Sequence, residues 1–290
     1  MDEPIIKRKI NPRRKPDWLK IRLPMTSSFS QVKGLIREHG LHTICTSGDC
    51  PNLGECWDAG TATFMILGDI CTRACKFCAV KTGRPTAVDN QEPIKLAEAI
   101  HTLKLKHCVI TSVDRDDLID GGAGIWAESI VQVKKRNPAI TIEVLIPDFI
   151  GDMSLVQKII DAAPNVISHN VETVERLTPK VRSKAQYRRS LEVIKYISDS
   201  GVRSKSGVML GIGETRGEVI QTMKDLISVG CQVMTIGQYL QPGVKNLEVL
   251  EYIKPEVFAE YKQIGLEMGF RFVESGPLVR SSYHAEKHVL

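Results

Sequence analysis

From residue 61 onward, short apolar runs alternate with longer segments in which apolar residues recur at helical spacing. The apolar runs predict strands at Thr61–Leu67, His107–Val113, Thr141–Ile146, Val166–Asn170, Ser204–Leu210 and Gln232–Gln238. The amphipathic segments predict helices at Glu92–Leu103, Gly124–Arg136, Ser154–Ala163, Tyr187–Ser200, Glu214–Val229 and Pro255–Met268. The pattern therefore predicts six strand–helix units in series.

Serial strand–helix units favour parallel strands, because a parallel neighbour needs a crossover connection that a helix supplies. The resulting α/β fold is either a partial (β/α)6 barrel or an open doubly wound sheet, and both place functional loops at the carboxyl ends of the strands. Residues 1–60 and 270–290 do not repeat the unit. We expect them to be an N-terminal and a C-terminal extension packed on a barrel formed by residues 61–269.

Composition and charge exclude several protein classes. The 290 residues are 42% hydrophobic and 25% charged, which excludes a disordered, collagen-like or coiled-coil chain. The net charge of +5 comes from residues 1–22, where eight basic residues face three acidic ones, and the remainder is balanced. We therefore expect no nucleic-acid surface along the chain. The basic segment is either a solvated arm or a contact for an acidic partner.

The hydropathy pattern contains no membrane span and no secretory signal. No run of about 18 apolar residues occurs, and the basic start of the chain lacks an apolar core followed by a cleavage site. We expect a cytoplasmic protein.

Eight cysteines are present, and six of them fall within residues 45–78. In a cytosolic chain of this size such density indicates metal binding rather than disulfides. Cys108 and Cys231 are isolated at the starts of two predicted strands, so we expect them to be buried structural thiols.

Cys71, Cys75 and Cys78 form a C-x3-C-x2-C triad directly after the first predicted strand. Three thiolates on one loop can bind three irons of a cubane and leave the fourth iron open, as a catalytic site requires. Zinc is the alternative, but structural zinc prefers four ligands. In spacing and position the triad resembles the radical S-adenosylmethionine (radical SAM) superfamily. This resemblance implies a partial barrel, S-adenosylmethionine on the open iron, and Phe77 near the adenine.

A second triad, Cys45, Cys50 and Cys56, has C-x4-C-x5-C spacing, for which zinc or unrelated thiols remain alternatives. The segment CPNLGECW around it, together with TSVDRDDLIDGGA and GPLVRSSYHA, resembles the lipoyl synthase family. The resemblance implies that these cysteines hold an auxiliary [4Fe–4S] cluster and that a C-terminal serine is its fourth ligand. That serine is Ser281, with Ser282 as the other candidate.

The resemblance also implies the reaction and its partners. Two sulfur atoms from the auxiliary cluster would be inserted at C6 and C8 of a protein-bound octanoyl-lysine, and S-adenosylmethionine would supply the radical. The expected partners are octanoylated carriers, namely 2-oxoacid dehydrogenase E2 subunits and the glycine cleavage H protein, with reduced ferredoxin or flavodoxin as electron donor. A methylthiotransferase, and a non-catalytic electron carrier or zinc-stapled binding protein, remain alternative functions.

Further site residues follow from strand ends. By resemblance, Thr111, Ser112 and Asp114 bind the methionine end of S-adenosylmethionine, and Asn170 and Glu172 can bind the ribose hydroxyls. Loop capping is the alternative role for these residues.

Two more predictions concern a glycine turn and a set of basic residues. Gly211, in a tight turn after the fifth strand, is expected to allow close approach of the adenosyl group. The basic N-terminal arm, Arg182, Arg188 and Arg189 are expected to dock an acidic carrier, so that affinity falls with added salt.

Overall fold

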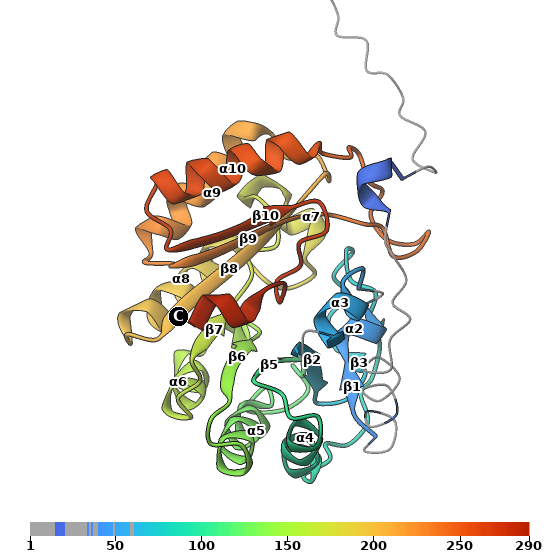
Figure 1. Cartoon of the computed structure of the whole chain (residues 1–290), viewed down its shortest axis with the longest axis vertical. Coiled ribbons are helices and arrows are strands. Elements are labelled where there is room, and N and C mark those ends of the chain that lie inside the picture. Colours follow the sequence, from blue (N-terminus) through green and yellow to red (C-terminus); the bar gives the residue numbers. More distant parts are fainter. Residues whose placement is uncertain are drawn as a thin grey trace, which may run out of the picture.

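The computed structural model describes residues 15–20, 34, 36, 40–48, 50–58 and 61–289. Its main feature is an eight-stranded sheet with strand order β1-β2-β5-β6-β7-β8-β9-β10 (Figure 1). The strands are β1 (His42–Thr43), β2 (Thr61–Ile66), β5 (His107–Ser112), β6 (Thr141–Leu145), β7 (Val166–Ser168), β8 (Arg203–Leu210), β9 (Val233–Gln238) and β10 (Phe272–Gly276). From β2 to β10 every neighbouring pair is parallel, whereas β1 is antiparallel to β2.

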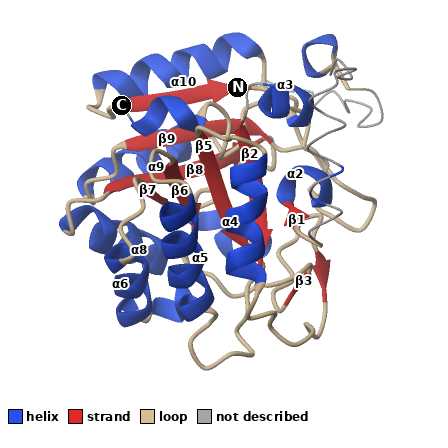
Figure 2. Cartoon of the chain, turned by 60° about the horizontal axis from the view of Figure 1, so that its bottom comes forward, coloured by secondary structure: helices blue, strands red, loops and turns tan. Residues whose placement is uncertain are grey.

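Long helices cover the outer face of this curved sheet (Figure 2). They are α4 (Glu92–Thr102), α5 (Ala123–Arg136), α6 (Met153–Asp161), α8 (Tyr187–Asp199), α9 (Arg216–Ser228) and α10 (Pro255–Glu267). The shorter elements are η1 (Asp17–Leu19), α2 (Ile44–Ser47), α3 (Leu53–Asp58), β3 (Ile70–Cys71), β4 (Lys81–Thr82), η2 (Phe149–Gly151), η3 (Glu175–Leu177), α7 (Thr178–Val181) and η4 (Ala285–Val289). None of the helices in the described ranges is long and apolar enough to cross a membrane.

The predicted partial barrel is confirmed, and all six predicted strands and helices are present with small shifts at their ends. The helix predicted from Glu214 begins instead at Arg216, because Thr215 caps it: the Thr215 hydroxyl accepts from the backbone N–H of Glu218, whose carboxylate accepts from the N–H of Thr215. The sheet also continues into a seventh parallel strand, β10, within the segment that was expected to be an extension. That strand was missed because its sequence, FVESG, is short and has only two apolar residues, of which Val273 alone is buried.

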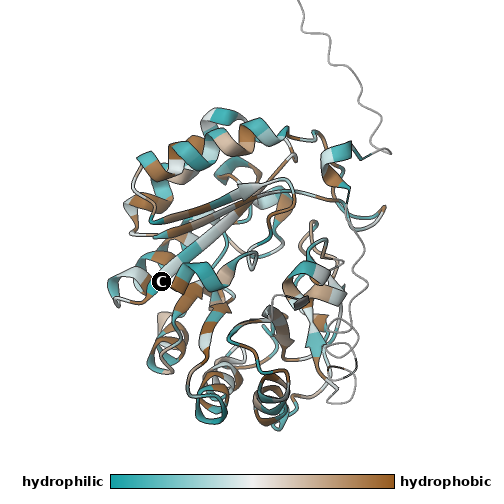
Figure 3. Ribbon diagram, in the orientation of Figure 1, coloured by the Kyte–Doolittle hydropathy of each residue, from teal (hydrophilic) through white to brown (hydrophobic). Residues whose placement is uncertain are grey.

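The strands form the core of the molecule because both of their faces are covered. Every residue of β2 and of β9 is buried, and the inward face of α5 contributes Trp126, Ile130 and Val133, none of which is exposed. Figure 3 shows hydrophobic residues along several of the strands and a mixture of hydrophobic and hydrophilic residues along the covering helices. Cys108 and Cys231 are buried at 0% and 2% exposure, as predicted for structural thiols.

The two ends of the described chain pack on each other at the side of the barrel. Helices α2 and α3 contact β2, and the segment after β10 turns back toward α3 before η4 packs against β5 and β6 (Figure 1). The Asn52 side-chain amide donates to the carbonyl of Leu278 at 2.7 Å, which joins the two segments directly.

Candidate active site

A cavity of about 480 Å³ lies at the carboxyl ends of the strands. Its lining includes ten of the residues predicted for the site, which are Cys71, Cys75, Phe77, Cys78, Thr111, Ser112, Asp114, Asn170, Glu172 and Ser281, but not the second cysteine triad. These residues come from four separate stretches of the chain, so the tertiary fold alone brings them together. Gly211 is the one predicted cofactor-binding residue that does not line this cavity.

The loop that carries Cys71, Cys75 and Cys78 is fixed by backbone hydrogen bonds. The Sγ of Cys71 accepts from the N–H groups of Arg73 and Asp114 at 3.4 and 3.3 Å, and the Sγ of Cys78 accepts from the N–H of Val80 at 3.5 Å. Hydrogen bonds to the sulfurs are a means by which proteins stabilise and tune iron–sulfur ligands. The loop is therefore preorganised for thiolate ligation.

Burial keeps the free thiols of Cys71 and Cys78 protonated. It raises the pKa of Cys71 to about 12, assisted by the neighbouring Asp114 carboxylate, and it raises the pKa of Cys78 to about 11. Cluster assembly must therefore displace these protons, because iron binds the thiolate form.

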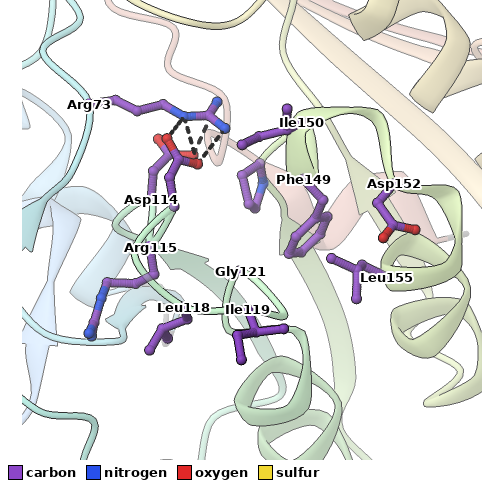
Figure 4. Close-up of a pocket in the computed structure, with 12 residues that line it drawn as sticks. Arg73, Asp114, Arg115, Leu118, Ile119, Gly121, Phe149, Ile150, Asp152 and Leu155 are labelled. Atoms are coloured by element: carbon purple, nitrogen blue, oxygen red, sulfur yellow. Dashed lines mark hydrogen bonds and ion pairs between the residues drawn. The ribbon is translucent and has the colours of Figure 1, made fainter.

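Arg73 ties the cysteine loop to two neighbouring loops. Its guanidinium, 3% exposed, lies 2.8 Å from Asp116, 2.8 Å from Asp148 and 3.4 Å from Asp114. Burial alone would raise the pKa of the Asp148 carboxyl, but Arg73, together with His169 and the backbone N–H of Ile150, lowers that pKa to about 2. Arg73 and Asp114 line both this cavity and another of about 290 Å³, in which Figure 4 shows the contact between their side chains. Arg73 was not predicted from the sequence, although it lies within the cysteine motif.

Asn170 and Glu172 present polar groups at the opposite wall of the cavity. The Asn170 amide donates to the Glu172 carboxylate at 3.2 Å, whereas its buried Oδ1 has no partner within the described structure. The Glu172 carboxyl is buried and weakly solvated, and this raises its pKa. A Cβ on the nearby Gly207 would meet Oγ1 of Thr235 at 2.4 Å. An unsatisfied acceptor beside a carboxyl fits the hydroxyl groups of a ribose.

Gly211 has a structural role that the sequence did not reveal. It lies at the end of β8 with φ +98°, and a Cβ there would meet Gln238 Nε2 and the Glu251 carbonyl, each at 2.3 Å. Its backbone N–H also donates to the Glu214 carboxylate. The close packing between loops is thus one reason for glycine at this position, and the expected contact with an adenosyl group stays a prediction; Gly207 and Gly237 are the glycines that, with Gly48, line the cavity.

The second triad lies on α2, α3 and the turn between them. Cys45 is 4% exposed, and its carbonyl accepts from the N–H of Cys50 at 3.1 Å. Burial raises the pKa of Cys45 to about 11 and that of Cys56 to about 12, and the other thiols of the triad reinforce the shift at Cys56. The structure thus places these three thiols within electrostatic reach of one another.

The C-terminal segment brings Ser281 to this region. The Tyr283 hydroxyl donates to the Glu55 carboxylate at 3.1 Å, and Arg280 lies close enough to Cys50 to affect the pKa of its thiol. Ser281 lines the main cavity, whereas Ser282 does not and its carbonyl accepts from the N–H of Ala285. These placements favour Ser281 over Ser282 as the residue directed toward the clusters.

Neither triad has the geometry of a site for a single metal ion within the described ranges. Among the residues that the structure describes, no three His, Cys, Asp or Glu side chains are arranged around one metal-ion position. A cubane differs from a single ion because each thiolate binds a separate iron. The preorganised loop and the grouped thiols fit that chemistry.

The expected docking role of three arginines is changed by their surroundings. Arg182 is 9% exposed, lines the cavity and donates to Ser190 Oγ at 2.8 Å, so it is unavailable to a protein partner. Arg189 is mostly buried against Asp148, and only Arg188 is well exposed, paired with Glu175. Of the basic segment of residues 1–22, only residues 15–20 belong to the described residues. The prediction that Arg182 docks a carrier protein is therefore wrong, because its side chain is buried and lines the cavity.

Comparison with known proteins identifies the family. The model of the radical SAM superfamily matches residues 65–226. The lipoyl synthase of Treponema denticola is 63% identical over 277 residues, covering 96% of both chains, and that of Bacteroides fragilis is 59% identical over 276 residues, covering 95% of this chain and 96% of the relative.

Solved structures agree on the fold. The crystal structure of methylornithine synthase superposes with a TM-score of 0.56 at 11% identity, covering 86% of this chain and 76% of that one. At this identity the likeness concerns the partial barrel alone. The family model and the sequence relatives show that this chain belongs to the lipoyl synthase family of the radical SAM superfamily.

Proposed function

We propose that this chain is a lipoyl synthase, which inserts two sulfur atoms at C6 and C8 of an octanoyl group held on a lysine of a carrier protein. The observation that carries the proposal is the single cavity in which Cys71, Cys75, Cys78 and Ser281 meet. The relatives named lipoyl synthase, which match 95–96% of this chain, support the same function. Neither a methylthiotransferase nor a non-catalytic electron carrier has comparable support.

The residues present fit two [4Fe–4S] clusters and S-adenosylmethionine. Cys71, Cys75 and Cys78 would hold the first cluster, whose open iron takes S-adenosylmethionine. The auxiliary cluster would be held by the ligand set Cys45, Cys50, Cys56 and Ser281. When bound, these groups supply a radical able to remove hydrogen from an unactivated carbon and the sulfur that replaces it.

The protein's own residues bind, orient and shield the reactants. Thr111, Ser112 and Asp114 are available to the methionine end of S-adenosylmethionine, and Asn170 and Glu172 are available to its ribose. Apolar lining residues at the ends of the strands, Val113, Leu145 and Val208, surround the remaining space. An apolar wall suits an octanoyl chain and excludes water from the reacting carbon.

Ser281 would be the detachable ligand of the auxiliary cluster. An alkoxide is a harder ligand than a thiolate, so it holds iron less selectively than the three cysteines do. Its departure would let the cluster release one iron as its sulfur is consumed. The expected result for Ser281→Cys is a cluster that assembles but does not support sulfur insertion. Normal turnover by this variant would contradict the role.

The partners follow from the reaction. The chain acts on lipoyl carrier proteins, as the family does, and we propose 2-oxoacid dehydrogenase E2 subunits and the glycine cleavage H protein as those carriers. Reduced ferredoxin or flavodoxin would be the electron donor. A cytoplasmic location is part of the same proposal.

Iron and acid-labile sulfide per chain, measured on anaerobically prepared protein, test the proposal. We expect about eight of each, falling to about four in Cys45→Ala and to about four in Cys71→Ala. Cys231→Ala is the matched control, because that thiol is buried outside both triads and the count should stay at about eight. Conversion of an octanoyl-lysine peptide to the lipoyl product, followed by mass spectrometry, then tests the reaction. Zinc in place of iron would refute the assignment.

A further inference from the structure

A buried ionic cluster lies inside the barrel, toward the amino ends of the strands and away from the cavity. Lys205 on β8 is 0% exposed, and its Nζ lies 2.7 and 2.8 Å from the two carboxylate oxygens of Glu143 on β6, whose side chain is 1% exposed. Neither residue lines the cavity. No step of the proposed reaction uses this pair.

The ion pair holds one further side chain, from the C-terminal helix η4. The ammonium group of Lys205 lies 3.2 Å from Nδ1 of His288, and His288 is fully buried. Burial, followed by the nearby Lys205, lowers the pKa of His288 to about 2, so the ring is neutral and Nδ1 accepts the hydrogen bond. The three donors of the ammonium group are thus divided between Glu143 and His288.

Other contacts fix the same helix. Arg203 donates from Nη1 to the carbonyl of His288, and the rings of Phe272 and His288 lie 5.8 Å apart. Ala285 is fully buried at the start of η4. A buried ion pair contributes little net stability compared with apolar packing, but it can specify a single arrangement of the groups it holds. Here it specifies where the C-terminal helix sits.

Ser281 precedes His288 by only seven positions. On its other side, the segment is fixed where Asn52 donates to the Leu278 carbonyl and where Arg280 donates to the Gln238 carbonyl at 3.2 Å. The residues from Leu278 to His288 therefore form a short connection held at both ends, with Ser281 facing the cavity in between.

We propose that Lys205, Glu143 and His288 form a C-terminal anchor that positions Ser281 for the auxiliary cluster. The anchor residues touch neither cluster nor substrate, and they act through the short segment that connects them to Ser281. The inference rests on the proposed function, because it takes Ser281 as the detachable ligand.

The test measures iron release rather than turnover. The full chain carrying Cys71→Ala, Cys75→Ala and Cys78→Ala is the parent, since only the auxiliary cluster then contributes iron. Loss of iron to an added chelator is followed anaerobically for the parent, His288→Leu, Ser281→Ala and the double variant. His101→Leu, on the exposed face of α4, is the matched control and should release iron at the parent rate.

If the anchor acts through Ser281, His288→Leu should speed the release of the first iron about tenfold, as expected for one lost hydrogen bond to a charged group. Ser281→Ala should do the same, and the double variant should be no faster than Ser281→Ala. His288→Gln offers an acceptor to Lys205 and should restore a rate near that of the parent, which separates a lost hydrogen bond from general unfolding.

The outcomes distinguish the two proposals. Iron release from His288→Leu at the rate of the parent would overturn the anchor and leave Ser281 as a ligand. The same conclusion would follow if the rate increases caused by His288→Leu and Ser281→Ala multiplied in the double variant. A parent rate for Ser281→Ala would overturn the ligand role, and the anchor with it.

Discussion

The contact between Arg73 and Asp148 offers a quantitative test of how the cysteine loop is held. The two side chains are 3% and 0% exposed and lie 2.8 Å apart. The pKa of Asp148 is lowered from 3.8 to about 2, which corresponds to roughly 2 kcal/mol of stability at neutral pH. This contribution is present above pH 3.8 and is lost as the pH falls toward 2.

Arg73→Met should cost more than this. It removes the closer of the two guanidinium groups paired with Asp148, while Arg189 stays at 3.3 Å, and it also removes the closest guanidinium partner of Asp116. Breaking a buried pair from one side costs about 3–5 kcal/mol when an uncompensated charge remains, and we expect a cost of about 3 kcal/mol because Arg189 still partly compensates Asp148. The cost of Asp148→Asn should be about 2 kcal/mol, and the double variant should be less destabilised than the sum of the two single variants.

Urea unfolding followed by far-UV circular dichroism measures these free energies of unfolding. Reduced protein freed of iron is used, so that metal loss does not contribute. The exposed pair Arg136 and Glu98, at 2.9 Å, is the control, and Arg136→Met should cost less than about 1 kcal/mol. A double-mutant cycle that is additive within about 0.5 kcal/mol would refute the reasoning, because it would mean that Arg73 and Asp148 do not interact.

Three further results are expected. Asn170→Ala should weaken S-adenosylmethionine binding by about tenfold in equilibrium dialysis, while the far-UV circular dichroism spectrum stays unchanged. The reason is that Asn170 lines the cavity and its Oδ1 has no hydrogen-bond partner in the described structure. Unchanged affinity would remove Asn170 from the site. Gly211→Ala should destabilise the fold by more than about 1 kcal/mol yet leave that affinity unchanged in the folded fraction, since its Cβ meets Gln238 and Glu251 rather than the cavity; a selective loss of affinity would restore the sequence-based role. Burial lowers the pKa of His107 and of His169 from 6.5 to about 4. Below pH 6.5 the unfolded chain therefore binds more protons than the folded chain does. As the pH falls from 6.5 toward 4, the free energy of unfolding should decrease by up to about 1.4 kcal/mol per pH unit for each ring. His107→Gln should flatten that slope between pH 6.5 and 5.5, and an equal slope in His107→Gln would show that the ring is not held neutral.

The sequence was sufficient for the parts of the site that are local in the chain. Three cysteines within eight residues lie close together in any fold, so the triad from Cys71 to Cys78 could be predicted as a ligand set from spacing. Alternation of strands and helices was equally informative, since its periodicities come from backbone geometry. Strand β10 was not predicted, because its place in the sheet depends on pairing with β9 rather than on its own composition.

Only the tertiary structure decided which distant residues meet. It placed Ser281 rather than Ser282 at the cavity, and it moved Gly211 away from the cavity and Gly207 into its lining. In the folded chain Arg182 is buried, and Lys205 contacts both Glu143 and His288 in the barrel interior. Such placements depend on which neighbours close around a side chain, and that is settled when the strands and both terminal segments pack together. Sequence periodicity specifies each helix and strand, whereas the partners of a buried charge are determined by how those helices and strands pack together.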